Sequence, residues 1–144
     1  MQVENLHYNA GKAAKDWRTM STVLVVEDSP VAREVVMKIL QREGYHVVGA
    51  CNGVEAMDFL HSDADAPDLM LLDVMMPEKD GMTLLQELRQ EPQYKELPVI
   101  LLTALSDDAR MKRARELGVA EYLVKTRFSY DELVDQVGKH VVRH

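Results

Sequence analysis

The chain has 144 residues, a length typical of one domain, and 47% of them are hydrophobic, which excludes disorder along the whole chain. Acidic residues outnumber basic ones by 24 to 17, and the resulting net charge of −7 argues against sequence-independent binding to nucleic acids or anionic membranes. A single cysteine and the lack of any apolar run near the ~20 residues of a membrane span predict a cytoplasmic protein without membrane insertion.

The first 20 residues differ in character from the rest. They lack hydrophobic periodicity and hold three basic against two acidic residues, a net charge of +1 in an otherwise acidic chain. We therefore expect residues 1–20 to form a flexible N-terminal extension and residues 21–144 to form one domain. A short docking helix around the lone Trp17 is the alternative.

Short apolar runs alternate with amphipathic segments from Thr22 onward. Five runs predict strands, three of them almost continuously hydrophobic, as in a parallel sheet covered on both faces: residues 22–27, 45–50, 68–73, 98–103 and 121–125. The segments between them carry helix signals, namely an N-cap with proline at 29–30, helical periodicity at 53–61, a turn at 80–81, an acidic start at 106–108 and a capping box at 129–132. This alternation predicts an α/β fold, a doubly wound (βα)5 domain.

Polar side chains stand where these predicted strands end. In an open parallel sheet the carboxyl ends of the strands meet at one edge, where ligands bind. The residues at these ends are Glu27 and Asp28, Asp73, Thr103 and Lys125.

Three neighbouring carboxylates repel one another unless a cation neutralises them, and so few oxygen ligands suit Mg²⁺ better than Ca²⁺. A metal on one side, with the Thr103 hydroxyl and the Lys125 ammonium on the other, can cradle a phosphoryl group. Asp73 stands at the end of the most buried strand and is then the natural nucleophile, forming an aspartyl phosphate. Each residue alone would more often be a cap or a surface charge, so it is their joint order that is specific.

Four motifs then carry a family resemblance. The segments VVEDS, LLDVMMP–DG, LLTA and YLVK resemble the receiver domain of two-component response regulators, over Ser21 to Val142. The resemblance implies a flavodoxin-like sheet of order 2-1-3-4-5, resembling the chemotaxis receiver. It also implies that Asp73 receives its phosphoryl group from a histidine kinase, a phosphotransfer protein or a small acyl phosphate.

The resemblance further implies roles for the surrounding residues. Asp28, Asp73 and the backbone carbonyl of Met75 would hold Mg²⁺, with Glu27 acting through water. The side chains of Thr103 and Lys125 would contact the phosphoryl oxygens.

A switch and an output surface are also implied. Tyr122, three residues before Lys125, matches a switch aromatic that turns inward when Thr103 moves toward the phosphoryl group. The face made by the fourth helix, fifth strand and fifth helix would then signal to a downstream protein, so the domain is regulatory and not an enzyme. A basic cluster on that face suits an acidic partner: Arg110, Lys112, Arg113 and Arg115. The expected state is a monomer or weak dimer.

Several alternatives stay open. The usual proline after the lysine is absent, since Thr126 follows Lys125, and this variant resembles receivers fused to chemotaxis-type hybrid kinases, acting as phosphate sinks or relay intermediates. An aspartate-nucleophile phosphatase needs an acid two residues after Asp73, where Met75 stands. A flavodoxin-like electron carrier needs a phosphate loop that Glu27 and Asp28 would repel. A degenerate receiver serving only as a binding module would not need all five site residues.

Overall fold

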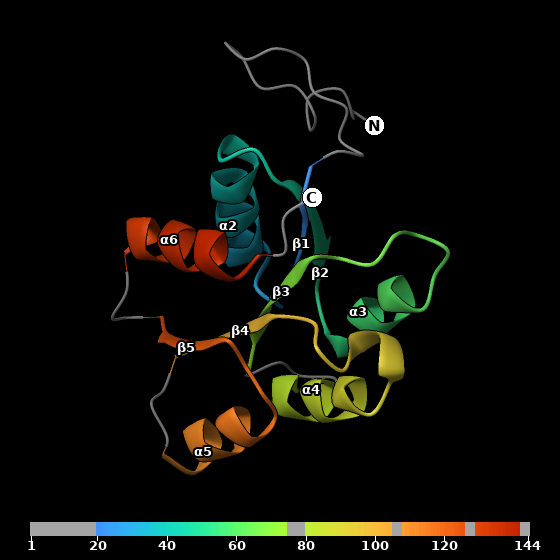
Figure 1. The fold of residues 1–144 in the computed structure, drawn as a ribbon. Helices are drawn as coiled ribbons and strands as arrows, with labels where there is room; N and C mark the ends of the chain where they lie inside the picture. The colour runs from blue at the N-terminus through green and yellow to red at the C-terminus, as the bar shows by residue number, and fades with distance from the viewer. Residues whose placement is uncertain (1–19, 75–79, 105–107, 126–128, 142–144) are drawn as a thin grey trace.

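The computed structural model describes residues 20–74, 80–104, 108–125 and 129–141. Five strands and five helices alternate in it, with one short 3-10 helix before the fourth strand (Figure 1). In chain order the elements are β1 (Thr22–Val26), α2 (Pro30–Arg42), β2 (His46–Ala50), α3 (Gly53–Leu60), β3 (Leu69–Asp73), α4 (Gly81–Arg89), η2 (Pro92–Tyr94), β4 (Val99–Thr103), α5 (Asp108–Glu116), β5 (Glu121–Val124) and α6 (Tyr130–His140).

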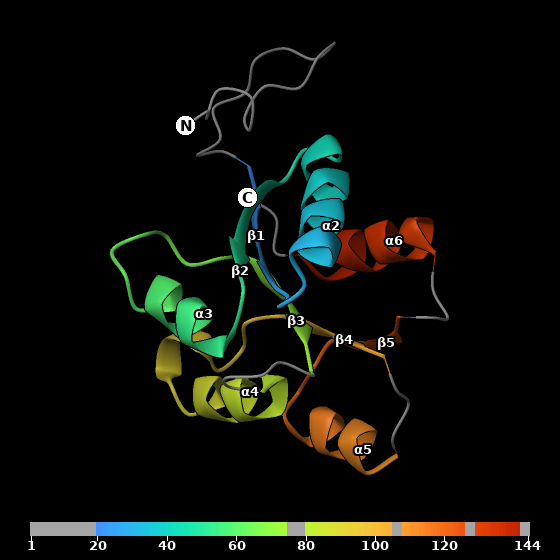
Figure 2. The ribbon, with the colours of Figure 1, turned by 180° about the vertical axis from the view of Figure 1, so that it is seen from behind.

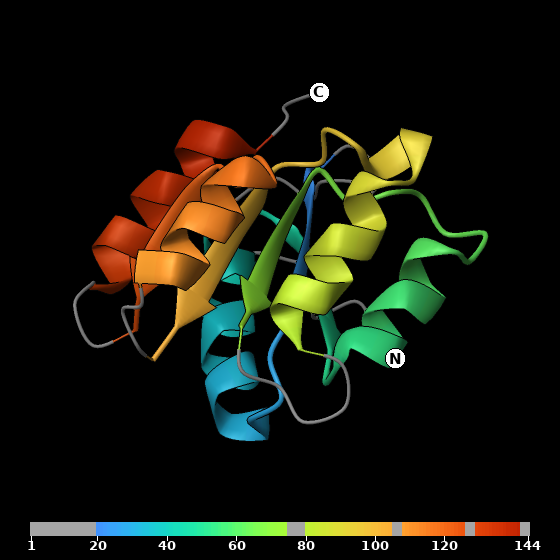
Figure 3. The same ribbon diagram turned by 90° about the horizontal axis from the view of Figure 1, so that it is seen from below.

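The strands form one parallel sheet in the order β2-β1-β3-β4-β5, which confirms the predicted flavodoxin-like (βα)5 fold. Helices α2 and α6 cover one face, and α3, α4 and α5 cover the other, as the views from behind and from below show (Figures 2 and 3). The connection from β2 to β3 passes across β1, so β2 and β3 pair with opposite edges of β1, and the carboxyl ends of β1 and β3 lie side by side.

Alternating side chains of the central strands contribute to two hydrophobic cores, one on each face of the sheet. Leu24, Leu72 and Leu101 pack against α3, α4 and α5, while Val25, Leu71 and Ile100 point to the α2–α6 face. Every residue of β3 and β4 is buried, which explains why the sequence of these strands is continuously hydrophobic and not alternating.

The helix starts follow the predicted caps. The Ser29 hydroxyl accepts a hydrogen bond from the Ala32 N–H at 3.2 Å, and Ser129 and Glu132 form the reciprocal capping box of α6. The predicted acidic start at 106–108 is described only from Asp108, where α5 begins. The 3-10 helix η2 was not predicted, because three residues carry too little periodicity to detect.

Candidate functional site

The site lies at the carboxyl edge of the sheet, where β1 and β3 end side by side. Glu27 follows β1 directly and Asp73 is the last residue of β3; both are 3% exposed. Asp28 is exposed beside them. One carboxylate oxygen from each of the three residues lies within 4.8 Å of the others, so the predicted acidic cluster exists as a spatial group.

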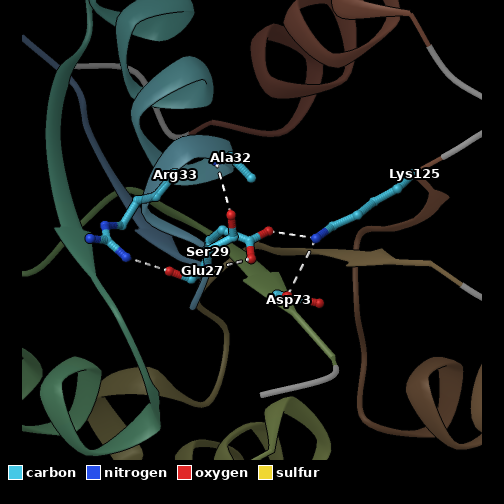
Figure 4. Close-up of polar contacts among 6 residues, drawn as sticks. All are labelled: Glu27, Ser29, Ala32, Arg33, Asp73 and Lys125. Carbon is cyan, nitrogen blue, oxygen red and sulfur yellow. Dashed lines mark hydrogen bonds and ion pairs between the residues drawn. The ribbon is translucent and has the colours of Figure 1, made fainter. Parts of the chain in front are cut away.

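Lys125 reaches this cluster from the end of β5, on the far side of β3 and β4. Its Nζ donates to Glu27 Oε1 at 2.5 Å and to Asp73 Oδ2 at 3.4 Å (Figure 4). Its side chain is 31% exposed, against 4% and 5% for its two partners. One ammonium against three carboxylates leaves two negative charges, which is the charge that a divalent cation would neutralise.

Three further hydrogen bonds hold Glu27 in place, one to its carboxylate and two to its backbone. The Ser29 N–H donates to Glu27 Oε2 at 3.1 Å, and the Arg33 guanidinium donates to the Glu27 carbonyl at 2.8 Å (Figure 4). The Glu27 N–H donates at 3.0 Å to the carbonyl of Ala50, the last residue of β2. The turn from β1 into α2 therefore sets the orientation of this carboxylate before any ligand binds.

These contacts shift the pKa values of both partners. Burial disfavours the ionised form of Glu27, but the hydrogen bonds from Lys125 and Ser29 outweigh it and hold the Glu27 pKa below its ordinary value. Burial likewise disfavours the Lys125 ammonium, yet the hydrogen bond to Glu27 and the charge of Asp73 raise the Lys125 pKa. Both groups are therefore ionised at neutral pH.

Thr103 is the site residue at the carboxyl end of β4. It is fully buried as the last residue of β4, one position beyond Leu102, which pairs with Asp73 in the sheet register. Its carbonyl accepts the Lys125 N–H at 2.6 Å, which fixes the path of the chain that carries the ammonium. Met75 lies outside the described residues, so its predicted carbonyl role has no structural counterpart here.

Tyr122 lies in β5 opposite Leu101 of β4. Its ring packs against the core under α3, α4 and α5, and within the described ranges its buried hydroxyl has no hydrogen-bond partner.

The predicted basic cluster lies on α5, where Lys112, Arg113 and Arg115 are exposed and Arg110 is half-buried. Arg113 pairs with Glu116 of the same helix at 3.4 Å.

The sequence predicted a turn at Gly81, but it did not predict that Gly81 lies against the backbone of Asp73. A Cβ at Gly81 would lie 2.5 Å from the Asp73 carbonyl oxygen and 2.9 Å from the Val74 Cα, so only glycine lets α4 begin this close to Asp73. The Gly81 N–H also donates to the Val74 carbonyl at 2.9 Å. The glycine of the LLDVMMP–DG motif is the sequence signal that marks it.

The fold and this edge define a class: a doubly wound domain with an acidic cluster and an ammonium at the ends of its central strands. The model of the family described as "Response regulator receiver domain" matches residues 23–138, and the chain belongs to that family. Receiver domains are regulatory signalling modules that interact with histidine kinases and downstream effectors, and they bind Mg²⁺ at an acidic pocket.

Three known proteins illustrate the similarity. A probable transcriptional regulator, ycf27 of Guillardia theta, is 40% identical over 118 residues, which cover 82% of this chain and 44% of that protein. The chain thus spans less than half the length of this relative. The signal receiver domain of a signal transduction histidine kinase from Syntrophus aciditrophicus is 38% identical, with a TM-score of 0.73, covering 83% and 88% of the two chains. Chemotaxis protein CheY4 of Vibrio cholerae is 30% identical, with a TM-score of 0.77, covering 85% and 99%.

None of the helices in the described part of the chain is long and apolar enough to cross a bilayer.

Proposed function

We propose that this chain is a phosphoacceptor switch in which Asp73 receives a phosphoryl group and the state of the domain signals to a partner protein. The observation that carries the proposal is the convergence of three carboxylates with the Lys125 ammonium on the buried end of β3. A nucleophile, a counter-charge for phosphoryl oxygens and a divalent-cation site are then contiguous.

In the proposed step an Asp73 carboxylate oxygen attacks the phosphorus of a phosphohistidine or a small acyl phosphate. A new O–P bond forms, the bond to the donor breaks, and its electron pair leaves with the donor group. Lys125, already within 3.4 Å of Asp73, would turn from Glu27 and Asp73 toward the transferred oxygens. Glu27, Asp28 and Asp73 would hold Mg²⁺, which supplies charge neutralisation for the phosphoryl group.

The switch would run through Thr103 and Tyr122. The transferred group would attract the Thr103 hydroxyl, whose movement changes the space available to Tyr122 on the neighbouring strand. Tyr122 is a partly buried residue of β5 that packs against the core, so its rearrangement would alter the proposed α5–β5–α6 surface. An acidic partner for the exposed cations Lys112, Arg113 and Arg115 of α5 stays a prediction, as does a cytoplasmic location.

A second candidate role is that of a phosphate sink or relay intermediate within a hybrid kinase. It is favoured by the similarity to a histidine kinase's receiver domain and by the threonine that follows Lys125 in place of proline. The two roles share the chemistry of Asp73 and differ in the acceptor. In a relay the phosphoryl group passes from Asp73 to a second histidine, whereas a terminal switch loses it to water.

The chemistry is tested with the 144-residue chain, Mg²⁺ and a small acyl phosphate, followed by intact mass measurement. We expect one phosphoryl adduct, its loss in Asp73→Asn, and its retention in Asp80→Ser, which removes a nearby carboxylate and keeps a residue able to cap α4. An adduct that persists in Asp73→Asn would overturn the proposal. So would the absence of an adduct both with acyl phosphate and with phosphorylated histidine kinases, or turnover of a phosphate monoester, which would instead favour a phosphatase.

A further inference from the structure

A small groove lies at the amino edge of the sheet, at the opposite end of the strands from Asp73. Its volume is about 320 Å³, near the lower end of the ~300–1,000 Å³ typical of ligand pockets, and enough for one large side chain. The walls come from the first residue of β1, alternate residues of β2, the last turn of α3 and the loop that follows: Thr22, His46, Val48, Phe59, Asp63, Ala64 and Asp65.

The groove has an apolar floor and an acidic rim. Val48 and Phe59 are only partly buried although both pack against the core under α3, α4 and α5, so part of each side chain faces the groove. Asp63 and Asp65 are exposed on the rim, and neither forms an ion pair with a cation in the described ranges. An occupant that suits this site carries an aromatic or large apolar group flanked by positive charge.

The groove also borders one edge of the described sheet. β2 is an edge strand, paired only with β1 within the described sheet. Proteins usually cover such edges, because their unpaired N–H and C=O groups attract other chains. A segment lying in this groove would cover the α3 side of that edge.

The N-terminal extension leaves the domain at this point. Met20 and Ser21 are each 9% exposed, and the Thr22 N–H donates to Asp68 Oδ2 at 2.7 Å, so the chain enters β1 from a fixed position. Trp17 stands five residues before Thr22, itself a wall of the groove, and is therefore within an extended reach of about 17 Å.

The chemistry of the extension matches that of the groove. Its single tryptophan is flanked by Lys15 and Arg18, and residues 12–19 contain three cations and one acid. We propose that the N-terminal extension docks intramolecularly in this groove, with the Trp17 indole against Val48 and Phe59 and the flanking cations beside Asp63 and Asp65. The short tether gives an effective concentration in the ~mM range, so that a weak contact is well populated.

Trp17 is the only tryptophan among these 144 residues, so its fluorescence in this chain reports the contact directly. We expect emission at shorter wavelength than that of indole in water, and several-fold slower quenching by acrylamide. The wavelength shift and the slower quenching should both be lost in the double variant Asp63→Lys/Asp65→Lys. They should also be lost in Ala64→Phe, because Ala64 is an exposed residue of the groove wall and the larger side chain would occupy the groove. High salt should weaken the shift, because part of the attraction is between exposed charges.

The matched control is Glu34→Lys/Asp135→Lys, which makes the same charge change at exposed positions of α2 and α6 on the other face and should leave the emission unchanged. Water-like emission in the folded chain would overturn the proposal, as would emission that ignores both groove variants while circular dichroism shows them folded. A shift that grows with protein concentration, together with dimers in sedimentation, would overturn it by assigning the groove to a second copy. Asp73→Asn should leave the Trp17 signal unchanged, so this result is separable from the phosphoacceptor chemistry.

Discussion

Two buried tyrosine hydroxyls differ in how they are satisfied. Tyr94 donates to the Leu60 carbonyl at 2.6 Å, whereas Tyr122 has no partner for its hydroxyl within the described ranges. Leaving a buried hydroxyl unpaired costs about 1–3 kcal/mol, and this cost makes the observed position of Tyr122 easy to change. The unpaired hydroxyl of Tyr122 therefore gives a physical reason why this residue of β5 would move in the proposed switch.

The two tyrosines provide a matched pair of variants. Tyr122→Phe should raise the free energy of unfolding, by about 1 kcal/mol, because it removes the unpaired hydroxyl. Tyr94→Phe should lower it by about 1–2 kcal/mol, because the Leu60 carbonyl loses its donor inside the protein. Urea unfolding of the unphosphorylated chain measures both, and a Tyr122→Phe variant destabilised as much as Tyr94→Phe would show that the Tyr122 hydroxyl is in fact satisfied.

At Gly81 the missing side chain is the important feature. Gly81→Ala should lower the free energy of unfolding by about 1–3 kcal/mol and slow the phosphorylation of Asp73, because the new Cβ displaces the Asp73 carbonyl or the start of α4. Gly138→Ala, on the exposed side of α6, is the control and should stabilise the protein by about 0.5–1 kcal/mol. Unfolding curves and the rate of adduct formation test the pair; an unchanged phosphorylation rate in Gly81→Ala would separate this glycine from the site.

At the scale of elements, one arginine ties α4 to two other segments. Arg89, in the last turn of α4, donates to the carbonyls of Leu117 at 2.7 Å and Gly118 at 3.3 Å, which follow α5, and to that of Tyr94 at 2.9 Å. Three charge-assisted bonds from one planar guanidinium fix the C-terminal end of α5 against α4. The opposite end of α5 follows the carboxyl end of β4, so this anchor leaves movement to the end of α5 nearer Thr103.

Removing this anchor should destabilise the fold. Arg89→Ala is expected to lower the free energy of unfolding by about 2–3 kcal/mol, since three carbonyls lose a charged donor. Arg42→Ala, at the exposed end of α2, should cost less than about 0.5 kcal/mol. Denaturant unfolding compares the two, and equal losses would mean that the Arg89 contacts contribute little in solution.

The sequence predicted the elements well because their signals are local. Each observed strand lies within one residue of its predicted range, and the caps at Ser29 and Ser129 form as expected. Hydrophobic periodicity and capping depend on neighbours in the chain, so they can be read without the fold. The Arg89 contacts join residues 28 and 29 positions apart and could not be read in this way.

At the scale of the whole molecule, we expect the acidic cluster to couple the stability of the fold to a divalent cation. With Lys125 in contact, the three carboxylates keep two uncompensated charges, so Mg²⁺ should bind the folded state and stabilise it by about 1.4 kcal/mol at ten times its dissociation constant. Thermal unfolding with Mg²⁺ and with EDTA measures the shift in Tm.

Asp28→Asn is the variant that tests this coupling. It should raise the stability of the metal-free protein by about 1 kcal/mol, because it removes like-charge repulsion, and should abolish most of the Mg²⁺ effect. Asp135→Asn, exposed on α6, should change neither quantity. A full Mg²⁺ shift in Asp28→Asn would place the cation elsewhere.

The sequence by itself determined the strands, the helix starts and the five polar residues at strand ends, because each depends on a pattern only a few residues long. The tertiary structure alone decided that Lys125 lies closer to Glu27 than to Asp73, that Gly81 abuts the Asp73 backbone and that the Tyr122 hydroxyl is buried without a described partner. These features depend on distances between segments far apart in the chain. Such distances are set by sheet register and helix packing, to which many residues contribute at once.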